Sequence, residues 1–400
     1  TLSTAIAFAL YASMGVALAQ DAAQDEDNEN ENVLEEVMVT GIRGSLQRSL
    51  VAKRDSESHV EVISAEDIGK MPDRNIADSL QRVPGVTIQR QFGEGSAVSI
   101  RGVGNELTLT TLNGQNVAST GWFVFQPAKR SFNYALLPSE LVGNIEVYKT
   151  SQADLPEGGI GGTVTINTRK PLQLDPLTVF VSAEGQYQDD SGETDPMVSG
   201  LLSWKNDNET FGALVSAVSQ ERSLQRQGNE AFWEWGAGPV AFEQERKRTA
   251  FTGALQFSPN ENLDVVLNYM DMEMEANNTN YALWLTQGNT SWSGIETPDE
   301  CLMGGTPVCG PLNVAFYQAR PREATMESDV IDLDLTYRGD GYSLEFQVGE
   351  TTSSGGTDFE MVVDDGTGGT PIVDGSYDFR SGDQRWDTGN IDIKTYDPGS

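Results

Sequence analysis

Histidine is almost absent from this sequence of 400 residues, which contains a single one, His59. It stands between Ser58 and Val60 in a polar stretch, so we assign it no functional role. This scarcity argues against histidine-based metal sites and against catalysis by a Ser-His-Asp triad. We therefore expect no metal ion, no cofactor and no enzymatic activity.

Basic residues are also few. The chain has 26 Lys and Arg against 60 Asp and Glu, which gives a formal net charge of −34. A nucleic-acid partner would require clusters of Lys and Arg, so no nucleic acid is expected. The acidic balance fits the surface of an exported protein.

Long hydrophobic runs are missing after the first residues. Residues 1–19 are apolar and small, and they end in Ala17-Leu18-Ala19, which is typical of a signal-peptide cleavage site. We interpret residues 1–19 as a signal peptide with a clipped start, and an N-terminal membrane anchor as the alternative. No later stretch reaches eighteen apolar residues, so any later membrane crossing must use β-strands.

The two cysteines, Cys301 and Cys309, enclose a short loop that contains two glycines and a proline. In an exported protein, two neighbouring cysteines predict a disulfide bond. A metal site would need further ligands, which the neighbouring sequence lacks. We expect the bond to stiffen an external loop.

Composition divides residues 20–172 into three parts. Residues 20–32 are acidic and of low complexity, so they should form a disordered tether. Residues 33–41 are suddenly apolar, and this segment is either a strand that adds to a partner's sheet or the first strand of the next domain. Residues 42–172 read as an α/β domain, in which Asn113-Gly114 predicts a type I′ hairpin turn.

After Pro171, residues 173–400 alternate between apolar and polar side chains, most clearly from Ile331 to Tyr337. Strands with one apolar and one polar face are typical of transmembrane barrels, and also of soluble sandwiches. Residues 222–248 and 276–327 read as long loops between strands. Unequal connections of this kind favour a barrel.

Six segments of the chain resemble motifs of TonB-dependent outer-membrane receptors, in the order that this family has them. They are residues 34–41 for the TonB box, residues 80–86, 100–104 and 112–114 for successive plug motifs, and residues 145–149 and 158–168 for the end of the plug. Residues 156–172 are similar to the subgroup common in Caulobacter- and Xanthomonas-like bacteria.

The resemblance implies an α/β plug domain, a small mixed sheet with short helices, inside an antiparallel transmembrane β-barrel of 22 strands in the outer membrane of a Gram-negative bacterium. The chain is long enough for only part of that barrel, so we expect an N-terminal fragment. The implied partners are TonB with its inner-membrane energising complex, outer-membrane lipid and a small-molecule or oligosaccharide substrate. The resemblance assigns TonB binding to Leu34, Glu35, Glu36, Val37, Met38, Val39 and Thr40.

Aromatic and basic side chains gather in residues 119–134, which makes this segment the best candidate for substrate binding. The candidates are Trp122, Phe123, Phe125, Lys129, Arg130, Phe132 and Tyr134. Packing of these aromatics against the barrel is an equally weighted alternative. Four tryptophans in the expected loops could join the site: Trp233, Trp235, Trp284 and Trp292.

Other plug residues are assigned structural roles. Arg101, with Arg82 and Glu146, should anchor the plug to the barrel, because a buried arginine requires a carboxylate partner. The glycines of residues 158–162 precede a strand, so we interpret them as a tight turn against the barrel wall. The structural set is Arg82, Pro84, Gly85, Arg101, Gly102, Asn113, Gly114, Glu146, Gly161 and Gly162.

These features predict TonB-dependent import across the outer membrane. A neutral oligosaccharide is the preferred cargo, because the expected mouth is acidic and aromatic, and a ferric siderophore is the alternative. A passive surface protein or adhesin is the alternative of another class. A glycan-cleaving carboxylate pair is disfavoured, since the acidic residues are dispersed.

Overall fold

The computed structural model describes residues 54, 60–64, 75–123, 129–153, 155–189, 191–232, 236–287, 298–304, 306–364, 369–381 and 385–391. The expected signal peptide, acidic tether and TonB box lie outside these residues. Residues 48–400 belong to one compact unit, and the fold below concerns this unit alone. Within the described ranges, no helix combines the length and apolar character needed to cross a membrane.

A small mixed sheet forms the first part of the described chain, and we call it the plug sheet. Its strands are β1 (Val60–Ser64), β4 (Thr108–Leu112), β5 (Gln115–Asn116), β6 (Val142–Tyr148) and β7 (Gly162–Thr168). They lie in the order β1-β6-β7-β4-β5, with a parallel β4–β7 pair. Side chains from the middle of β6 and β7 point into the core, where Ile145, Val147 and Val164 have no exposed surface.

A separate hairpin and a short helix complete the plug. The hairpin joins β2 (Val86–Gln91) to β3 (Glu94–Ile100), and helix α4 (Ile76–Leu80) lies against it. The buried face of α4 contains Ile76 and Leu80. Asn75 caps the helix by accepting a hydrogen bond from the amide of Asp78. Short 3-10 turns occur at η1 (Asn105–Leu107), η2 (Ser139–Leu141), η3 (Pro171–Gln173) and η4 (Asp299–Cys301).

The predicted type I′ turn is present at Asn113-Gly114, between β4 and β5. Both residues have positive φ angles, 50° and 86°, as this turn type requires. The side-chain oxygen of Asn113 accepts hydrogen bonds from the amide and the hydroxyl of Thr168. The turn therefore ties the end of β4 to the end of β7.

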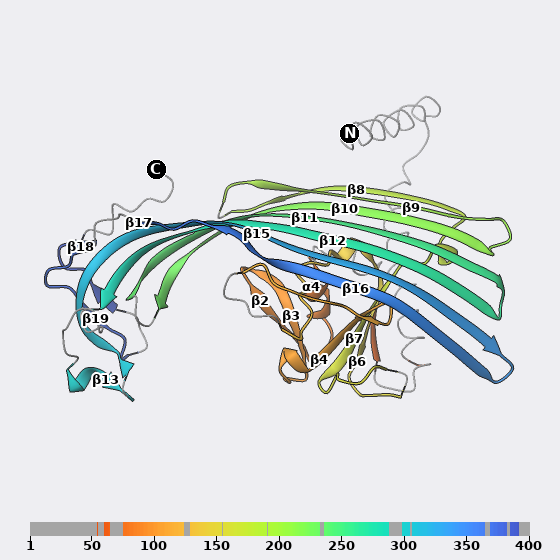
Figure 1. Ribbon diagram of the computed structural model, residues 1–400, viewed down its shortest axis with the longest axis horizontal. Helices are drawn as coiled ribbons and strands as arrows, with labels where there is room; N and C mark the ends of the chain where they lie inside the picture. The colour runs from red at the N-terminus through yellow and green to blue at the C-terminus, as the bar shows by residue number, and fades with distance from the viewer. Residues whose placement is uncertain are drawn as a thin grey trace, which may run out of the picture. The chain divides into compact units, whose positions relative to one another are not determined.

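The second part of the chain is a sheet of long antiparallel strands, which we call the wall (Figure 1). Its main strands are β8 (Leu177–Tyr187), β9 (Thr194–Lys205), β10 (Phe211–Phe232), β11 (Gly236–Asn260), β12 (Leu263–Gln287), β15 (Cys309–Gly339) and β16 (Tyr342–Glu360). Each pairs with the next in the order of the chain. The inner face of the wall is the one whose side chains share a hydrophobic core with the plug, among them Phe242, Met272 and Met326.

The segments predicted as long loops are largely strands of the wall. Residues 222–248 are mostly a paired hairpin, in which β10 and β11 stay in register from Ser223 and Glu245 to Phe232 and Gly236. Residues 276–327 likewise contain the ends of β12 and β15. These segments do not show apolar alternation because polar and apolar side chains are mixed along them, whereas backbone pairing continues regardless of side-chain polarity.

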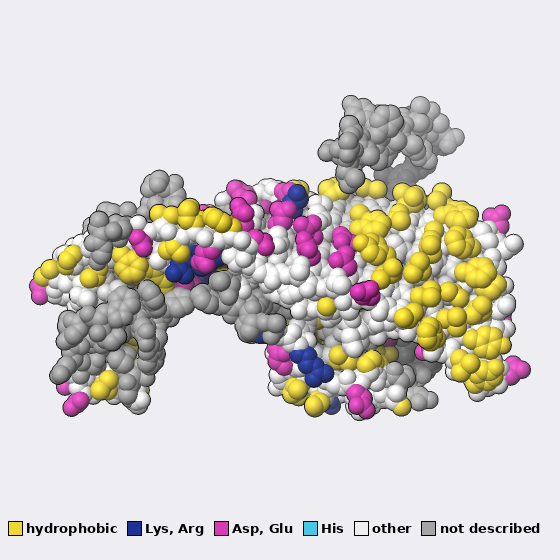
Figure 2. All heavy atoms as spheres, in the orientation of Figure 1, with side chains coloured by type: hydrophobic (Ala, Val, Ile, Leu, Met, Phe, Trp, Pro, Cys, Tyr) yellow, Lys and Arg dark blue, Asp and Glu magenta, His cyan; other side chains and the backbone are white. Residues whose placement is uncertain are grey.

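The outer face of the wall, opposite to the plug, carries a band of apolar side chains. Cross-strand register places Leu202, Val215, Leu255, Leu267 and Leu333 on this face, each 37–49% exposed. Figure 2 shows such side chains gathered over the long strands, with acidic side chains next to them. An exposed band bordered by charges is what a strand needs to face lipid.

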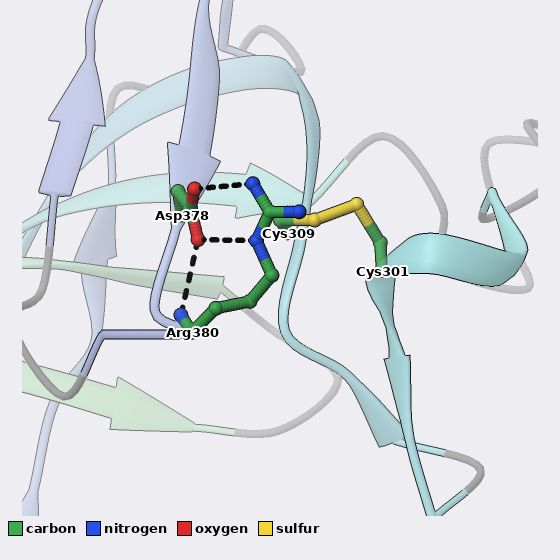
Figure 3. The surroundings of a disulfide bond; sticks show 4 residues. All are labelled: Cys301, Cys309, Asp378 and Arg380. Carbon is green, nitrogen blue, oxygen red and sulfur yellow. Dashed lines mark hydrogen bonds and ion pairs between the residues drawn. A yellow bond between two sulfur atoms is a disulfide. The ribbon is translucent and has the colours of Figure 1, made fainter.

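Several short strands lie beside the N-terminal part of β15. The short strands are β13 (Leu302–Met303), β14 (Thr306–Pro307), β17 (Val363–Asp364), β18 (Thr370–Pro371), β19 (Ser376–Asp378) and β20 (Arg385–Asp387). Cys301 and Cys309 form a disulfide bond there, with their Cα atoms 4.8 Å apart. Figure 3 shows this bond beside Asp378, which pairs with Cys309 across β15 and β19 and forms an ion pair with Arg380.

Candidate functional site

The aromatic segment of residues 119–134 divides into core residues and site residues. Trp122, Phe132 and Tyr134 are at most 5% exposed and belong to the hydrophobic core shared by plug and wall. The hydroxyl of Tyr134 is 2.6 Å from that of Thr110, and burial raises the pKa of Tyr134. For Trp122 and Tyr134, this burial favours the packing alternative over substrate contact.

Phe123 and Lys129 line a cavity of about 260 Å³ in the plug. The cavity lies between the β2–β3 hairpin and residues 119–133, and Phe132 forms part of its lining. Its other lining residues are mainly polar: Gln89, Arg90, Gln91, Ser96, Ala97, Asn105, Ser119, Thr120, Gly121, Ser131 and Asn133. This volume is close to the lower limit of about 300 Å³ for small-molecule pockets.

Arg130 does not line this cavity and instead forms hydrogen bonds with neighbouring plug residues. Its backbone amide donates to the carboxylate of Glu106, at 2.9 Å, and its guanidinium donates to the carbonyl of Gly158, at 3.2 Å. Both contacts hold the segment to neighbouring plug loops. Phe125, the remaining candidate, lies outside the described residues.

A second cavity, of about 40 Å³, lies between plug and wall. The plug contributes Phe92 and Phe123, so Phe123 lines both cavities. The wall contributes Arg226, Glu230, Phe242, Asn280, Trp284, Arg320 and Arg322. Of the four loop tryptophans considered from the sequence, Trp284 lies in β12 and joins the site, and the other three lie outside the described residues.

Arginines are concentrated around this second cavity and the neighbouring inner wall. They occur as pairs spaced by two or four residues, a spacing that puts both members on one face of a strand. The pairs are Arg222 and Arg226 in β10, Arg246 and Arg248 in β11, and Arg320 and Arg322 in β15. The inner wall next to the plug therefore carries a concentration of basic side chains.

The tip of the β2–β3 hairpin reaches the wall through Glu94. Its carboxylate is 1% exposed and pairs with Arg246, with Arg248 at 3.0 Å and with Arg222 at 3.5 Å. Burial alone would raise the pKa of Glu94, but the attraction of the three guanidinium groups prevails and lowers it from 4.5 to about 2. Glu94 is therefore ionised at neutral pH.

This cluster replaces the anchor expected at Arg101. Arg101 and Arg82 are both exposed, and Arg101 lies in a turn where its amide donates to the carbonyl of Gly85, at 2.7 Å. Glu146 accepts hydrogen bonds from Asn144 and Tyr148, which are in its own strand. The buried anchor thus has a carboxylate from the plug and arginines from the wall, opposite to the expected arrangement.

The glycines of residues 158–162 pack within the plug and not against the wall. Gly162 has a φ of 147°, and a Cβ atom there would be 2.7 Å from both Ile100 and the carbonyl of Tyr148. Gly161 similarly lies against Val103 and the carbonyl of Leu107. The prediction of a tight turn is confirmed, but the turn packs against other plug residues and not against the barrel wall.

Comparison with known proteins agrees with this architecture. The family model described as TonB-dependent Receptor Plug Domain matches residues 52–163. The chain is 29% identical over 203 residues to the ferric enterobactin receptor PirA of Pseudomonas aeruginosa, covering 47% of this chain and 26% of that protein. It is 30% identical over 161 residues to the probable TonB-dependent siderophore receptor PirA of Acinetobacter baumannii, covering 37% and 21%.

A third relative is the iron-regulated outer membrane virulence protein of Vibrio cholerae, 29% identical over 51% of this chain and 30% of that protein. The matched regions therefore span less than a third of these relatives' length. Among solved structures, a mutant of the ferric enterobactin receptor PfeA from Pseudomonas aeruginosa matches with 14% identity and a TM-score of 0.43, covering 77% of this chain and 50% of that one.

The plug match and the apolar outer band together identify the wall as antiparallel strands of an outer-membrane β-barrel. The protein is located in the outer membrane of a Gram-negative bacterium. The chain contains a TonB-dependent receptor plug domain.

Proposed function

We propose that this protein imports a ferric siderophore across the outer membrane, with energy delivered through TonB. The observation that carries the proposal is the group of side chains between plug and wall, where Arg226, Arg320 and Arg322 meet Phe92, Phe242 and Trp284 around a space of about 40 Å³. A space of this size admits only a small part of such a ligand, so the ligand would lie over these side chains. Siderophores bind Fe³⁺ through anionic oxygen atoms, and many of them contain aromatic rings. Guanidinium groups and aromatic faces are the side chains suited to such a ligand.

The charge of this cavity favours a siderophore over the neutral oligosaccharide that the composition suggested. Glu230 pairs with Arg226, and Glu360 pairs with Arg322 at 3.0 Å and with Arg320 at 3.9 Å. Three guanidinium groups thus face two carboxylates, and an anionic ligand would restore the balance. The relatives named for ferric enterobactin and for siderophores support the same ligand class.

Coupling to TonB would use Leu34 to Thr40, the segment that resembles the TonB box. An extended apolar segment can add as a strand to a partner's sheet edge, where backbone hydrogen bonds transmit a pulling force. Its pull would act on the plug that follows it in the chain. No covalent chemistry on the cargo is required for this transport.

Uptake assays in cells producing the protein test this proposal. Cells would receive iron-55 chelates of catecholate, hydroxamate and citrate type, and separately radiolabelled maltodextrins and other oligosaccharides. We expect saturable binding and uptake of one iron chelate. Deleting residues 33–41 should abolish its uptake and leave its binding intact.

Two results would contradict the proposal. Saturable uptake of an oligosaccharide without binding of any chelate would assign the cavity to a carbohydrate. Chelate uptake that is unchanged after the deletion would indicate passive entry and remove the role of TonB.

A further inference from the structure

The cavity of about 260 Å³ in the plug, which we call the plug cavity, differs in chemistry from the arginine and aromatic side chains between plug and wall, which we call the plug–wall group. Most side chains that line the plug cavity are amides and hydroxyls, which can both donate and accept hydrogen bonds. Among the described residues that line it, none is a carboxylate, and two are cations, Arg90 and Lys129.

The two cations leave the plug cavity close to neutral. The guanidinium of Arg90 forms an ion pair with Asp78, at 2.7 Å, which balances its charge. Lys129 is exposed, so water screens its charge. Beside the lining, the carboxylate of Glu106 accepts hydrogen bonds from the amide and the hydroxyl of Ser131, both at 3.3 Å. A carboxylate this close disfavours an anion in the cavity, so the lining suits a neutral guest.

Hydrogen bonds hold the walls of the plug cavity in place without a ligand. The side-chain amide of Asn105 donates to the side-chain oxygen of Gln89, at 3.3 Å, and to the hydroxyl of Ser131, at 3.4 Å. The side-chain amide of the buried Asn133 donates to the carbonyl of Thr120, at 3.1 Å. A preformed site loses less conformational entropy on binding than a flexible one. The lining is therefore arranged to receive a guest.

Two aromatic rings border this polar lining. Phe132 is buried, and the half-buried Phe123 has edge-to-face contacts with Phe92 and Trp122, at centroid distances of 5.5 Å and 5.4 Å. Aromatic faces pack against the C–H face of a sugar ring, while the hydroxyls of the sugar bind polar groups. At about 30 Å³ for each water molecule, the cavity has room for roughly nine, which is enough space for one sugar ring.

The plug cavity and the plug–wall group are neighbours. Phe123 lines both. Gln91 and Phe92 are consecutive in the chain, and Gln91 lines the plug cavity whereas Phe92 belongs to the plug–wall group. A ligand that lies over the plug–wall group can therefore extend a substituent into the plug cavity.

We propose that the plug cavity is a subsite for a sugar ring, and that the cargo is a ferric siderophore with a neutral sugar substituent. The anionic, aromatic chelate lies over Arg226, Arg320 and Arg322, and the sugar occupies the plug cavity. The inference rests on the proposed function, because it adds a second part to the same ligand. It assigns one part of the cargo to each of two neighbouring surfaces of opposite chemical character.

Three iron(III) chelates of one tricatecholate test the subsite: the unsubstituted chelate, one with a single glucose on a catechol ring, and one with a cyclohexyl group at the same place. Their dissociation constants would be measured with iron-55 on cells producing the protein. The glucose derivative should bind about tenfold more tightly than the unsubstituted chelate, as one or two added hydrogen bonds would allow. The cyclohexyl derivative should bind no more tightly than the unsubstituted chelate, because it leaves the polar lining unpaired.

Two substitutions place the sugar in the plug cavity. Ser96→Phe fills the cavity and should abolish the preference for the glucose derivative, measured as the ratio of the two dissociation constants. Gln91→Ala is a milder change that removes one amide from the lining, and it should reduce this ratio. Thr87→Phe is the matched control, because Thr87 is exposed on β2 of the same hairpin and does not line the cavity. It should leave the ratio unchanged.

The outcomes separate the subsite from the proposed function. Equal binding of the three chelates to the wild-type protein would mean that the cavity holds only water, which overturns the subsite and leaves the ligand class standing. A cyclohexyl derivative that binds as tightly as the glucose derivative would overturn the sugar assignment, and so would a preference that survives both Ser96→Phe and Gln91→Ala. Failure of all three chelates, with binding of another iron chelate, would overturn the inference alone. Failure of every iron chelate would overturn the proposed function as well.

Discussion

At the scale of single residues, Glu94 shows how one side chain stabilises the packing of the plug against the wall. Its carboxylate forms ion pairs with three buried arginines, Arg222, Arg246 and Arg248. Removing one partner of such a cluster leaves uncompensated charge in the interior, which costs about 3–5 kcal/mol. The cluster therefore makes the docking of the plug dependent on one ionised group.

Glu94 should make plug docking sensitive to acid. Its pKa is about 2 in the folded protein and 4.5 in the unfolded reference, so the stabilisation is complete above pH 4.5. It should be lost as the pH falls from 4.5 towards 2, with a total of about 3 kcal/mol. Thermal unfolding in micelles across this pH range measures it. The difference between wild type and Glu94→Gln should shrink at low pH, and parallel curves would refute the assignment.

At the scale of elements, turns and strands differ in how well the sequence predicts them. Asn113-Gly114 is predictable because its backbone requirement is local and few residues meet it. The alternation from Ile331 to Tyr337 is predictable because one face is apolar. The paired ends of β10 and β11, from residue 222 to residue 248, are not, since polar and apolar side chains do not alternate there.

Contacts between distant elements are the part of the site that sequence reasoning missed. Glu94 and Arg246 are separated by 152 residues. The register of β10 and β11 places Arg222 opposite Arg246, and the packing of the plug against the wall brings Glu94 to both. The spacing of Arg222 and Arg226, and of Arg246 and Arg248, was the available signal. Each pair had to share one strand face, but nothing local indicated that this face meets the plug.

The Asn113-Gly114 turn provides a test at this scale. Gly114 has a φ of 86°, and a Cβ atom there would be 3.0 Å from the side chain of Gln347 in β16. Gly114→Ala should lower the free energy of unfolding by roughly 1–2 kcal/mol, measured by urea titration. Gly104→Ala is the control, because a Cβ there meets nothing within 4 Å and the backbone has a negative φ. Equal effects of the two changes would contradict the strain argument.

At the scale of the whole molecule, surface polarity follows the environment. The outer band faces lipid with apolar side chains, although the chain as a whole carries a net charge of −34. Further along the same strands Asp271 lies opposite Asp329, and Glu273 lies opposite Glu327. Most of the acidic excess can therefore stay in water, because the band itself contains so few charges.

Leu255, on the outer face of β11, tests the placement of this band. Leu255→Arg should weaken folding into lipid vesicles by about 2–4 kcal/mol, as a charge in the lipid-facing zone does. Glu245→Arg, on the same face of the same strand but beyond the band, should cost only about 0–1 kcal/mol. Urea titration of vesicle-inserted protein gives both values. A larger penalty for Glu245→Arg would mean that the band is misplaced.

The hydrogen bond between Gln347 and the backbone of Asn113 also bears on the order of assembly. It joins residues 234 positions apart, and the amide of Ala118 bonds Thr351 over 233 positions. The wall hairpins, in contrast, close over turns as short as Asp340-Gly341. Because short loops close faster and at lower entropic cost than long ones, hairpins should form first. Contacts between plug and wall should therefore form last. A plug that folds late would have to enter a space that the wall strands already surround.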